Sequence, residues 1–335
     1  MRARPICDEF SDKGKHAMAR NLFKTALALS GGSARALTHL GVLEELERYK
    51  VRVDMIVGTS MGAIIGGLYA YYADVATVIQ KMRKLIESDL FVKSVSIATE
   101  DIPEIGPDGF FNRFLWLFRR GVYYTHSMIR PTLVAEDTYT EIMDSLLPDL
   151  AIEDLRLPFA SIATDLGTGE EIVLRSGSLR KAVAASAAIP GLLPSVQHLG
   201  RPLVDGGWVD NVPAAPAIAL GAHFVIAVDA TLEVTGLGAT PISAIETLFR
   251  CNELTRISLT RHRKNCADIL LAPGIGDMNW ANFTAMERCM SAGRDVFRRD
   301  VDRILRKRQM RRYRSLWGSL HPAREPAWQH PFTIL

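Results

Sequence analysis

The chain has 335 residues, of which 48% are hydrophobic and 23% charged, and its formal net charge at pH 7 is +3. That length allows one large α/β domain or two small ones with a substantial core. The small net charge gives no reason to expect a nucleic-acid partner. The first residues contain no apolar segment typical of a secretory signal, and no uninterrupted apolar run of about 20 residues predicts a membrane-spanning helix.

The cysteines show no C-x-x-C spacing and no regular framework; they are Cys7, Cys251, Cys266 and Cys289. We therefore expect reduced thiols rather than disulfides or metal ligands. This pattern favours a cytoplasmic protein without a metal site.

A β-loop-α unit opens the ordered part of the chain. Residues 1–24 are polar and are expected to form a frayed extension. The first strand is predicted at Thr25–Leu29, followed by a loop at Ser30–Arg35 and a helix from about Ala36 to Lys50. Leucines recur near one face of that helix, and charged residues supply the other.

The glycine-containing loop has three interpretations. A dinucleotide site would need G-x-G-x-x-G, but Ser33 and Ala36 replace two of the glycines. An ordinary tight turn is the second. We favour the third, an oxyanion hole, because consecutive small residues let backbone N–H groups converge on one point, where an arginine adds positive charge. The candidate residues are Gly31, Gly32, Ser33 and Arg35.

The next unit, from Val53 to Tyr72, carries Gly58-Thr59-Ser60-Met61-Gly62 between an apolar strand and an apolar helix. A G-x-S-x-G in that setting is typical of a nucleophile elbow, and a structural turn is the alternative. The serine must lie on a very tight turn, where flanking side chains would collide with the strand and the helix. Ser60 is therefore the candidate nucleophile, with Gly58 and Gly62 as elbow glycines.

A helical insert is predicted at about 75–150, with helices at Val75–Leu90 and within Thr125–Leu147. Between them, Gly109–Arg120 is rich in Phe and Trp and has basic ends. Two interpretations of this segment carry equal weight: a surface that meets lipid, and a lid helix packed on the core.

The sheet is predicted to resume at Pro158–Leu166, which a Gly-Thr-Gly turn links to a strand at Glu171–Leu174 as a hairpin. A small-residue helix at Ser178–Ala188 follows. Arg201–Val204 is then a strand that leads into Asp205-Gly206-Gly207. A carboxylate at this strand end can reach into a cleft past the bare backbone of the two glycines.

A serine hydroxyl needs a base, usually histidine, to take its proton. No histidine has a local sequence signal for that role among His16, His39, His126, His198, His223, His262, His321 and His330. Aspartate is the other candidate, and Asp205 competes with Asp54, Asp165, Asp210 and Asp229. Only Asp205 combines a strand end with glycines that would admit a substrate, which gives it a small advantage.

The last third is predicted to contain a helix at Pro213–Leu220 and strands at His223–Ala230 and Ala267–Pro273. Outer helices are predicted at about 242–263 and 283–307. Residues 298–314 hold nine Lys or Arg against two Asp. That run either lies on anionic lipid headgroups or forms a solvated helix face, and charge runs are more often the latter.

Three blocks together resemble the patatin-like phospholipase family: SGGSARALTHLGVL at Ser30–Leu43, GTSMG at Gly58–Gly62, and ASAAIPGLLPSV with PLVDGGWVDNVP between Ala185 and Pro213. The resemblance runs from about Ala26 to Leu271. It implies a three-layer α/β/α fold with a mostly parallel central sheet, and a serine–aspartate dyad. Matched by position, the nucleophile is Ser60, the base with its glycines is Asp205, Gly206 and Gly207, and the oxyanion loop is Gly31, Gly32, Ser33 and Arg35.

This chain departs from the family in the oxyanion loop. The family usually has G-G-G-x-R/K-G, where Ser33 and Ala36 stand here. Backbone N–H donors survive a change from Gly to Ser, but a left-handed backbone angle would strain a serine.

The resemblance further implies hydrolysis of acyl esters in phospholipids or lysophospholipids through an acyl-enzyme, without metal or organic cofactor. The expected location is cytoplasmic, with peripheral contact to the inner face of a membrane as an option. Alternatives are an acyltransferase that uses the same serine and a weakly active lipid-binding or regulatory protein. The expected divisions are an extension at 1–24, the patatin-like domain at 25–275 and a helical extension with a basic tail at 276–335.

Overall fold

The computed structural model describes residues 23–99, 132–231, 244–275, 278–317 and 332–335. The expected N-terminal extension at 1–24 lies almost wholly outside these residues. So do the aromatic segment at 109–120 and the middle of the expected helical insert. The division into three parts remains a prediction.

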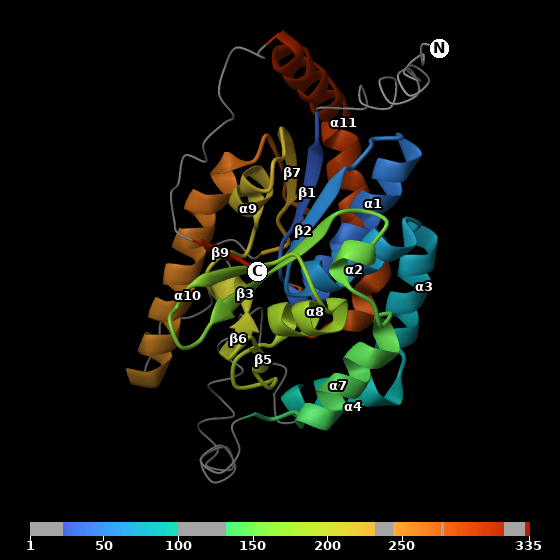
Figure 1. Ribbon diagram of the computed structural model, residues 1–335. Helices are drawn as coiled ribbons and strands as arrows, with labels where there is room; N and C mark the ends of the chain where they lie inside the picture. Colours follow the sequence, from blue (N-terminus) through green and yellow to red (C-terminus); the bar gives the residue numbers. More distant parts are fainter. Residues whose placement is uncertain (1–22, 100–131, 232–243, 276–277, 318–331) are drawn as a thin grey trace, which may run out of the picture.

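The core of the fold is a nine-stranded mixed sheet with the order β5-β6-β3-β2-β1-β7-β8 (Figure 1). As expected, its centre is parallel, through the pairs β1–β2, β1–β7, β2–β3 and β7–β8. These strands are β1 (Thr25–Leu29), β2 (Met55–Thr59), β3 (Phe159–Asp165), β7 (Phe224–Val228) and β8 (Ile269–Leu271).

Antiparallel pairs lie on one side of the sheet. The predicted hairpin joins β3 to β4 (Glu171–Leu174), and β6 (Arg201–Asp205) also pairs with β3. Two short strands were not predicted. One is β5 (Val196–His198), antiparallel to β6, and the other is β9 (Phe332–Ile334), parallel to β4.

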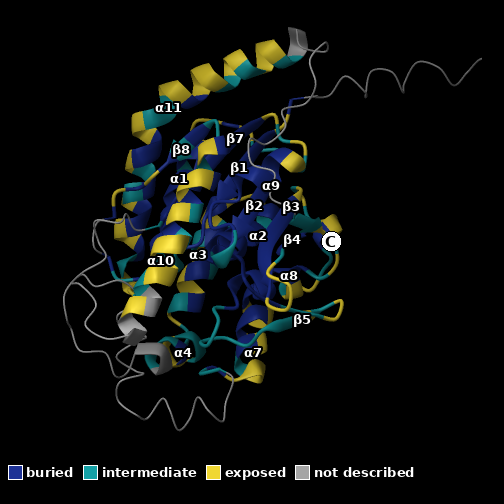
Figure 2. Cartoon of the chain, turned by 90° about the vertical axis from the view of Figure 1, so that its left-hand side faces the viewer, coloured by how far each residue is buried: buried dark blue, intermediate teal, exposed yellow. Residues whose placement is uncertain are grey.

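Two hydrophobic cores, one on each face of the sheet, make the fold three-layered. Alternate side chains of β1 point to opposite faces, as strand geometry requires: Leu27 and Leu29 enter the larger core, and Ala26 and Ala28 the smaller. Figure 2 shows the central strands β1, β2, β3 and β7 as buried and many of the exposed residues on the outer helices. The helices that enclose the larger core are α1 (Thr38–Arg48), α2 (Met61–Tyr72), α3 (Val75–Ile86), α7 (Glu136–Leu146), α8 (Leu179–Ala187) and α11 (Met286–Trp317).

The opposite face carries α9 (Ala214–Ala219), which contributes Ala214, Ala215 and Ala217 to the smaller core. In Figure 1, α10 (Ala244–Arg263) lies on the same side as α9, and α1, α2 and α3 lie on the other. The expected three-layer α/β/α architecture is confirmed. The helix predicted at Val75–Leu90 is divided in two, because α3 ends at Ile86 and α4 (Asp89–Thr99) begins three residues later.

β2 and β6 meet end to end along β3, and this arrangement places Ser60 next to Asp205. β2 pairs in parallel with β3 up to the contact Thr59–Ile162, and β6 pairs antiparallel from the next residue of β3, through Ala163–Asp205. The two strands therefore approach the same point of β3 from opposite directions. The residues at their ends, 145 positions apart in sequence, become neighbours.

The basic run at 298–314 lies within α11, which extends ten residues beyond its predicted end. Arg308 Nε donates to Thr25 Oγ1 at 3.0 Å, and Arg311 Nε lies 3.2 Å from Asp268 Oδ1. Since Thr25 begins β1, these arginines lie at the amino-terminal edge of the sheet. Ser60 follows the carboxyl end of β2, at the other edge.

Candidate active site

Ser60 occupies a strained turn between β2 and α2. Its backbone angles are φ 55° and ψ −124°, a left-handed conformation that costs energy for any residue with a side chain. A Cβ at Gly58 would lie 2.5 Å from the Gly62 oxygen, and one at Gly62 would lie 2.3 Å from the Leu29 oxygen. Both glycines are therefore required by packing, as the elbow interpretation expects.

The Ser60 hydroxyl donates a hydrogen bond to Asp205, with 2.6 Å between Oγ and Oδ2. Asp205 ends β6 and is 3% exposed; its Oδ1 accepts the Gly207 N–H at 2.7 Å. A Cβ at Gly206 would lie 2.2 Å from the Ile162 oxygen, so only glycine lets this turn pass so close to β3. The structure thus brings together the serine and the aspartate that the sequence singled out.

Burial gives the Asp205 carboxyl an unusual affinity for protons. Desolvation raises its pKa from 3.8 to about 6, although the hydrogen bonds from Ser60 and Gly207 and the charge of Arg256 favour the ionised form. A carboxylate with a pKa near neutrality can accept a proton from an alcohol and return it to a leaving group.

Two contacts that the sequence did not predict hold the elbow in place. The Ser60 N–H donates to Ser186 Oγ of α8 at 2.9 Å, and Thr59 Oγ1 donates to the backbone carbonyl oxygen of Asp210 at 2.8 Å. Both join β2 to segments that flank Asp205 in sequence. Ser186 is a serine within a run of alanines, and no local pattern distinguishes it from a core residue.

The glycine loop packs directly against Ser60. A Cβ at Gly31 would lie 3.1 Å from Ser60 Cβ, and Ser33 lines the same cavity as Ser60. Ser33 has a φ of 51°, so the strain foreseen for a serine here is present.

The loop leaves two N–H groups free. The N–H of Gly31 donates to the backbone carbonyl oxygen of Asn211. Within the described chain, the N–H groups of Gly32 and Ser33 have no protein acceptor. As the first residue of α2, Met61 also has an N–H group with no acceptor in its own helix. These three groups are the available donors for an oxyanion.

The Arg35 side chain is buried near charged residues of another helix rather than in the cavity beside Ser60. Its side chain is 7% exposed, and burial lowers its pKa to about 10; Arg256 adds repulsion, while Glu253 opposes the change. Both of these residues belong to α10, and Arg35 is not among the described residues that line the cavity. Its expected action on an oxyanion remains a prediction.

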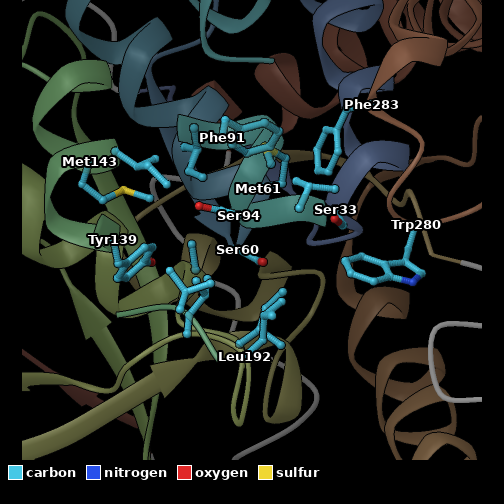
Figure 3. Close-up of a pocket in the computed structure, with 17 residues that line it drawn as sticks. Ser33, Ser60, Met61, Phe91, Ser94, Tyr139, Met143, Leu192, Trp280 and Phe283 are labelled. Carbon is cyan, nitrogen blue, oxygen red and sulfur yellow. The ribbon is translucent and has the colours of Figure 1, made fainter. Parts of the chain in front are cut away.

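An apolar cavity opens beside Ser60 (Figure 3). Its space, open mouth included, is about 710 Å³. In Figure 3, Ser60 lies near the centre, and labelled side chains around it come from α4, α7, the segment that contains Leu192 and the segment before α11. Most of the lining is aliphatic or aromatic, including Phe91, Met143, Leu192, Trp280 and Phe283.

Tyr139 contributes a polar atom to the cavity wall but no reactive one. Its hydroxyl donates to the Ala184 oxygen at 2.7 Å, and burial, with the negative charge of Asp205, raises its pKa well above the ordinary value. It therefore stays neutral with its proton engaged. The cavity is suited to a hydrocarbon chain, and the Ser60 hydroxyl lies at its edge.

The competing acids have other partners. Asp54 pairs with Arg52, Asp165 with Arg201, Asp210 with Arg263 and Asp229 with Lys264. His39 Nε2 contacts the Ser30 oxygen, and His223 Nδ1 accepts from the Lys24 N–H. Neither histidine lines the cavity. Among the described residues, no group of three His, Cys, Asp or Glu could hold a metal ion.

Comparison with known proteins identifies the family. The family model for the patatin-like phospholipases matches residues 27–218, more than half of the chain. The chain belongs to the patatin-like phospholipase family. The resemblance carried by the glycine loop, the elbow and the D-G-G block is thereby confirmed. So is the patatin-type α/β fold.

Members of the patatin-like phospholipase family that are similar to this chain are much longer proteins. Patatin-like phospholipase domain-containing protein 6 of Mus musculus is 32% identical over 224 residues, which are 66% of this chain and 14% of the mouse protein. Lysophospholipase nte1 of Emericella nidulans is 32% identical over 225 residues, 64% of this chain and 12% of that protein.

Among solved structures, VipD from Legionella pneumophila shares 15% identity with this chain at a TM-score of 0.42. The alignment covers 85% of this chain and 67% of VipD. Within the described residues, no helix is long and apolar enough to cross a membrane.

Proposed function

We propose that the protein is a serine acyl hydrolase that cleaves acyl esters of phospholipids or lysophospholipids, with Ser60 as nucleophile and Asp205 as its base. The observation that carries this proposal is the 2.6 Å contact between the two side chains at the edge of an apolar cavity. The names of the relatives, phospholipase and lysophospholipase, support the substrate class.

In the proposed first step, Asp205 Oδ2 takes the proton from Ser60 Oγ while Oγ bonds to the ester carbonyl carbon. The N–H groups of Gly32, Ser33 and Met61 stabilise the negative charge on the carbonyl oxygen. The C–O bond to the alcohol then breaks, and that alcohol leaves with the proton held by Asp205. The acyl group remains on Ser60 Oγ, with its hydrocarbon chain in the cavity.

In the second step, Asp205 takes a proton from a water molecule as the water oxygen bonds to the acyl carbon. The bond to Ser60 Oγ breaks, the serine recovers its proton and a fatty acid is released. Loss of one oxyanion donor typically lowers the rate by about 100- to 1000-fold.

We also propose that lipid approaches the carboxyl edge of the sheet rather than the basic end of α11. Phe283, beside the start of α11, lines the cavity, whereas Arg308 lies 22 residues after Met286. At 1.5 Å per residue this separation is roughly 33 Å. A bilayer that touched only the basic end of α11 would not reach Ser60.

The test compares Ser60→Ala with Ser94→Ala, because Ser94 is a second serine in the wall of the same cavity. Release of fatty acid from lysophosphatidylcholine and from p-nitrophenyl esters should be abolished in the first variant and unchanged in the second. A fluorophosphonate probe should label the parent and Ser94→Ala but not Ser60→Ala. Parent-level hydrolysis by Ser60→Ala would refute the proposal. Products formed with an added alcohol acceptor distinguish hydrolysis from acyl transfer.

A further inference from the structure

His39 lies behind the glycine loop and is completely buried in α1. Its Nε2 is 2.8 Å from the Ser30 carbonyl oxygen. Burial lowers the pKa of the ring to about 4, despite the Ser30 bond and the charge of Asp229, so the ring is neutral at pH 7. Since a carbonyl only accepts, the single ring proton is on Nε2, and His39 donates to Ser30.

The other ring nitrogen has no partner. His39 Nδ1 is buried and makes no hydrogen bond within the part of the chain that the structure describes. An unpaired buried nitrogen destabilises a fold, and an apolar side chain of similar size would avoid that cost. The histidine is therefore poorly explained as packing, and what distinguishes it is its bond to Ser30.

That bond fixes the first of three peptide planes. In a trans peptide, the carbonyl of one residue and the N–H of the next point in opposite directions. His39 holds the Ser30 carbonyl, and the Gly31 N–H, at the other end of the same plane, donates to the Asn211 oxygen at 3.2 Å. This plane cannot rotate without losing both bonds.

The next two planes are held through their carbonyls alone. Ser30 Oγ donates to the Gly31 oxygen at 2.9 Å, and the Arg35 N–H donates to the Gly32 oxygen at 3.1 Å. Their N–H groups, those of Gly32 and Ser33, are the free donors of the loop. Their direction depends on these two carbonyl bonds, the first of which comes from the Ser30 side chain, and on the Ser30–Gly31 plane from which they continue.

Ser30 is also the point where the loop meets the rest of the site. Its N–H donates to the Val228 oxygen, and its Oγ accepts the Ala230 N–H. A Cβ at Gly62 would lie 2.5 Å from the Ser30 oxygen, so that oxygen also borders the first turn of α2. Movement of this carbonyl would disturb both the loop and the elbow.

We infer that His39 is a positioning residue for the reaction: through its Nε2 hydrogen bond to the Ser30 carbonyl, it sets the peptide planes that direct the Gly32 and Ser33 N–H groups toward the oxyanion. This inference rests on the proposed function. His39 is not among the described residues that line the cavity, so its contribution is to transition-state stabilisation rather than to binding.

Three substitutions at His39 test it. Gln places an amide donor near the position of Nε2, Asn places one near Nδ1 instead, and Leu removes the donor and keeps the volume. Turnover of a p-nitrophenyl ester is measured per active site, counted by the stoichiometry of fluorophosphonate labelling, with thermal unfolding followed in parallel. We expect kcat to fall at least about tenfold in His39→Leu and His39→Asn, with KM within about twofold. His39→Gln should recover most of the parent kcat.

Parent-like kcat per labelled site in folded His39→Leu would overturn the inference. If His39→Leu does not fold, the comparison of Gln with Asn decides, and equal kcat values overturn the inference. A purely structural role would lower the unfolding temperature and the number of labelled sites but not the kcat of each site. Failure of the proposed function would show differently, as turnover by the parent that does not depend on Ser60.

Discussion

Replacement of Asp205 by Asn is expected to stabilise the protein at neutral pH while it removes the proposed base. The carboxyl is buried, and its pKa of about 6 in the folded state exceeds the ordinary value of 3.8. The folded state therefore disfavours the charge that Asp205 carries at pH 7. An Asn side chain has nearly the same shape and carries no charge. Its oxygen can accept the Gly207 N–H, and its amide can donate to Ser60 Oγ.

The magnitude follows from the two pKa values. Each pH unit between them corresponds to 1.36 kcal/mol, so the penalty in the parent approaches roughly 3 kcal/mol once Asp205 is fully ionised. Hydrogen bonds to Asn are weaker than those to a carboxylate, so we expect a net gain of about 1–2 kcal/mol. The size of this gain depends on pH. The parent loses stability as pH rises from 3.8, the pKa of the carboxyl in the unfolded state, through about 6, its pKa in the folded state. At about pH 4 the folded carboxyl is protonated and the unfolded one is only about half ionised, so most of the gain is lost.

Urea denaturation of the parent and of Asp205→Asn, at about pH 7 and about pH 4, measures this difference. Asp165→Asn is the matched control. Burial alone would raise the pKa of Asp165, but hydrogen bonds from Gly167, Thr168 and Arg201 outweigh it and leave the pKa below its ordinary value. That substitution should therefore destabilise the protein at pH 7. If Asp205→Asn is no more stable than the parent at neutral pH, the raised pKa is wrong and the carboxylate is better stabilised than its burial indicates.

Three further predictions concern turnover. Because a base must be ionised, kcat/KM of the parent should fall as pH drops through about 6, the pKa of Asp205, and a profile that stays flat to about pH 5 would contradict this assignment. Ser33→Gly relieves a left-handed angle and keeps the N–H donor, so urea denaturation should show stability equal to or above that of the parent, with kcat within about threefold. Met143→Phe fills part of the cavity; kcat/KM should fall at least about tenfold for p-nitrophenyl palmitate and remain near the parent value for the butyrate. Equal losses for both esters would show that Met143 does not limit acyl length.

Much of the fold followed from local patterns. β1 has the predicted bounds. The G-x-S-x-G and D-G-G motifs lie at strand ends, as predicted, and their glycines are needed because a Cβ at Gly58, Gly62 or Gly206 would collide with neighbouring backbone. β9 could not be predicted in this way. It is three residues long, and only its pairing with β4 makes it a strand.

The site residues that belong to a sequence motif could be predicted. Those defined only by contacts with other segments of the chain could not. Ser60 and Asp205 are marked by their glycines. The Ser186 and Ser30 side chains accept hydrogen bonds from backbone N–H groups far away in sequence, those of Ser60 and Ala230, and no local sequence pattern predicts those bonds. His39 likewise has no local sequence signal, and its bond to the Ser30 carbonyl depends on how α1 packs behind the glycine loop.

The end-to-end approach of β2 and β6 along β3 has a consequence for how sequence can vary in this protein. Thr59, the residue before Ser60, pairs with Ile162, and Asp205 pairs with Ala163, the next residue of the same buried strand. Loops inserted elsewhere between Ser60 and Asp205 can lengthen or shorten without altering their separation, since loop closure adds little free energy with length. Tolerance to insertions and deletions should therefore be wide in the loops of that interval and absent at β3 itself, where a shift of one residue in register would separate the pair.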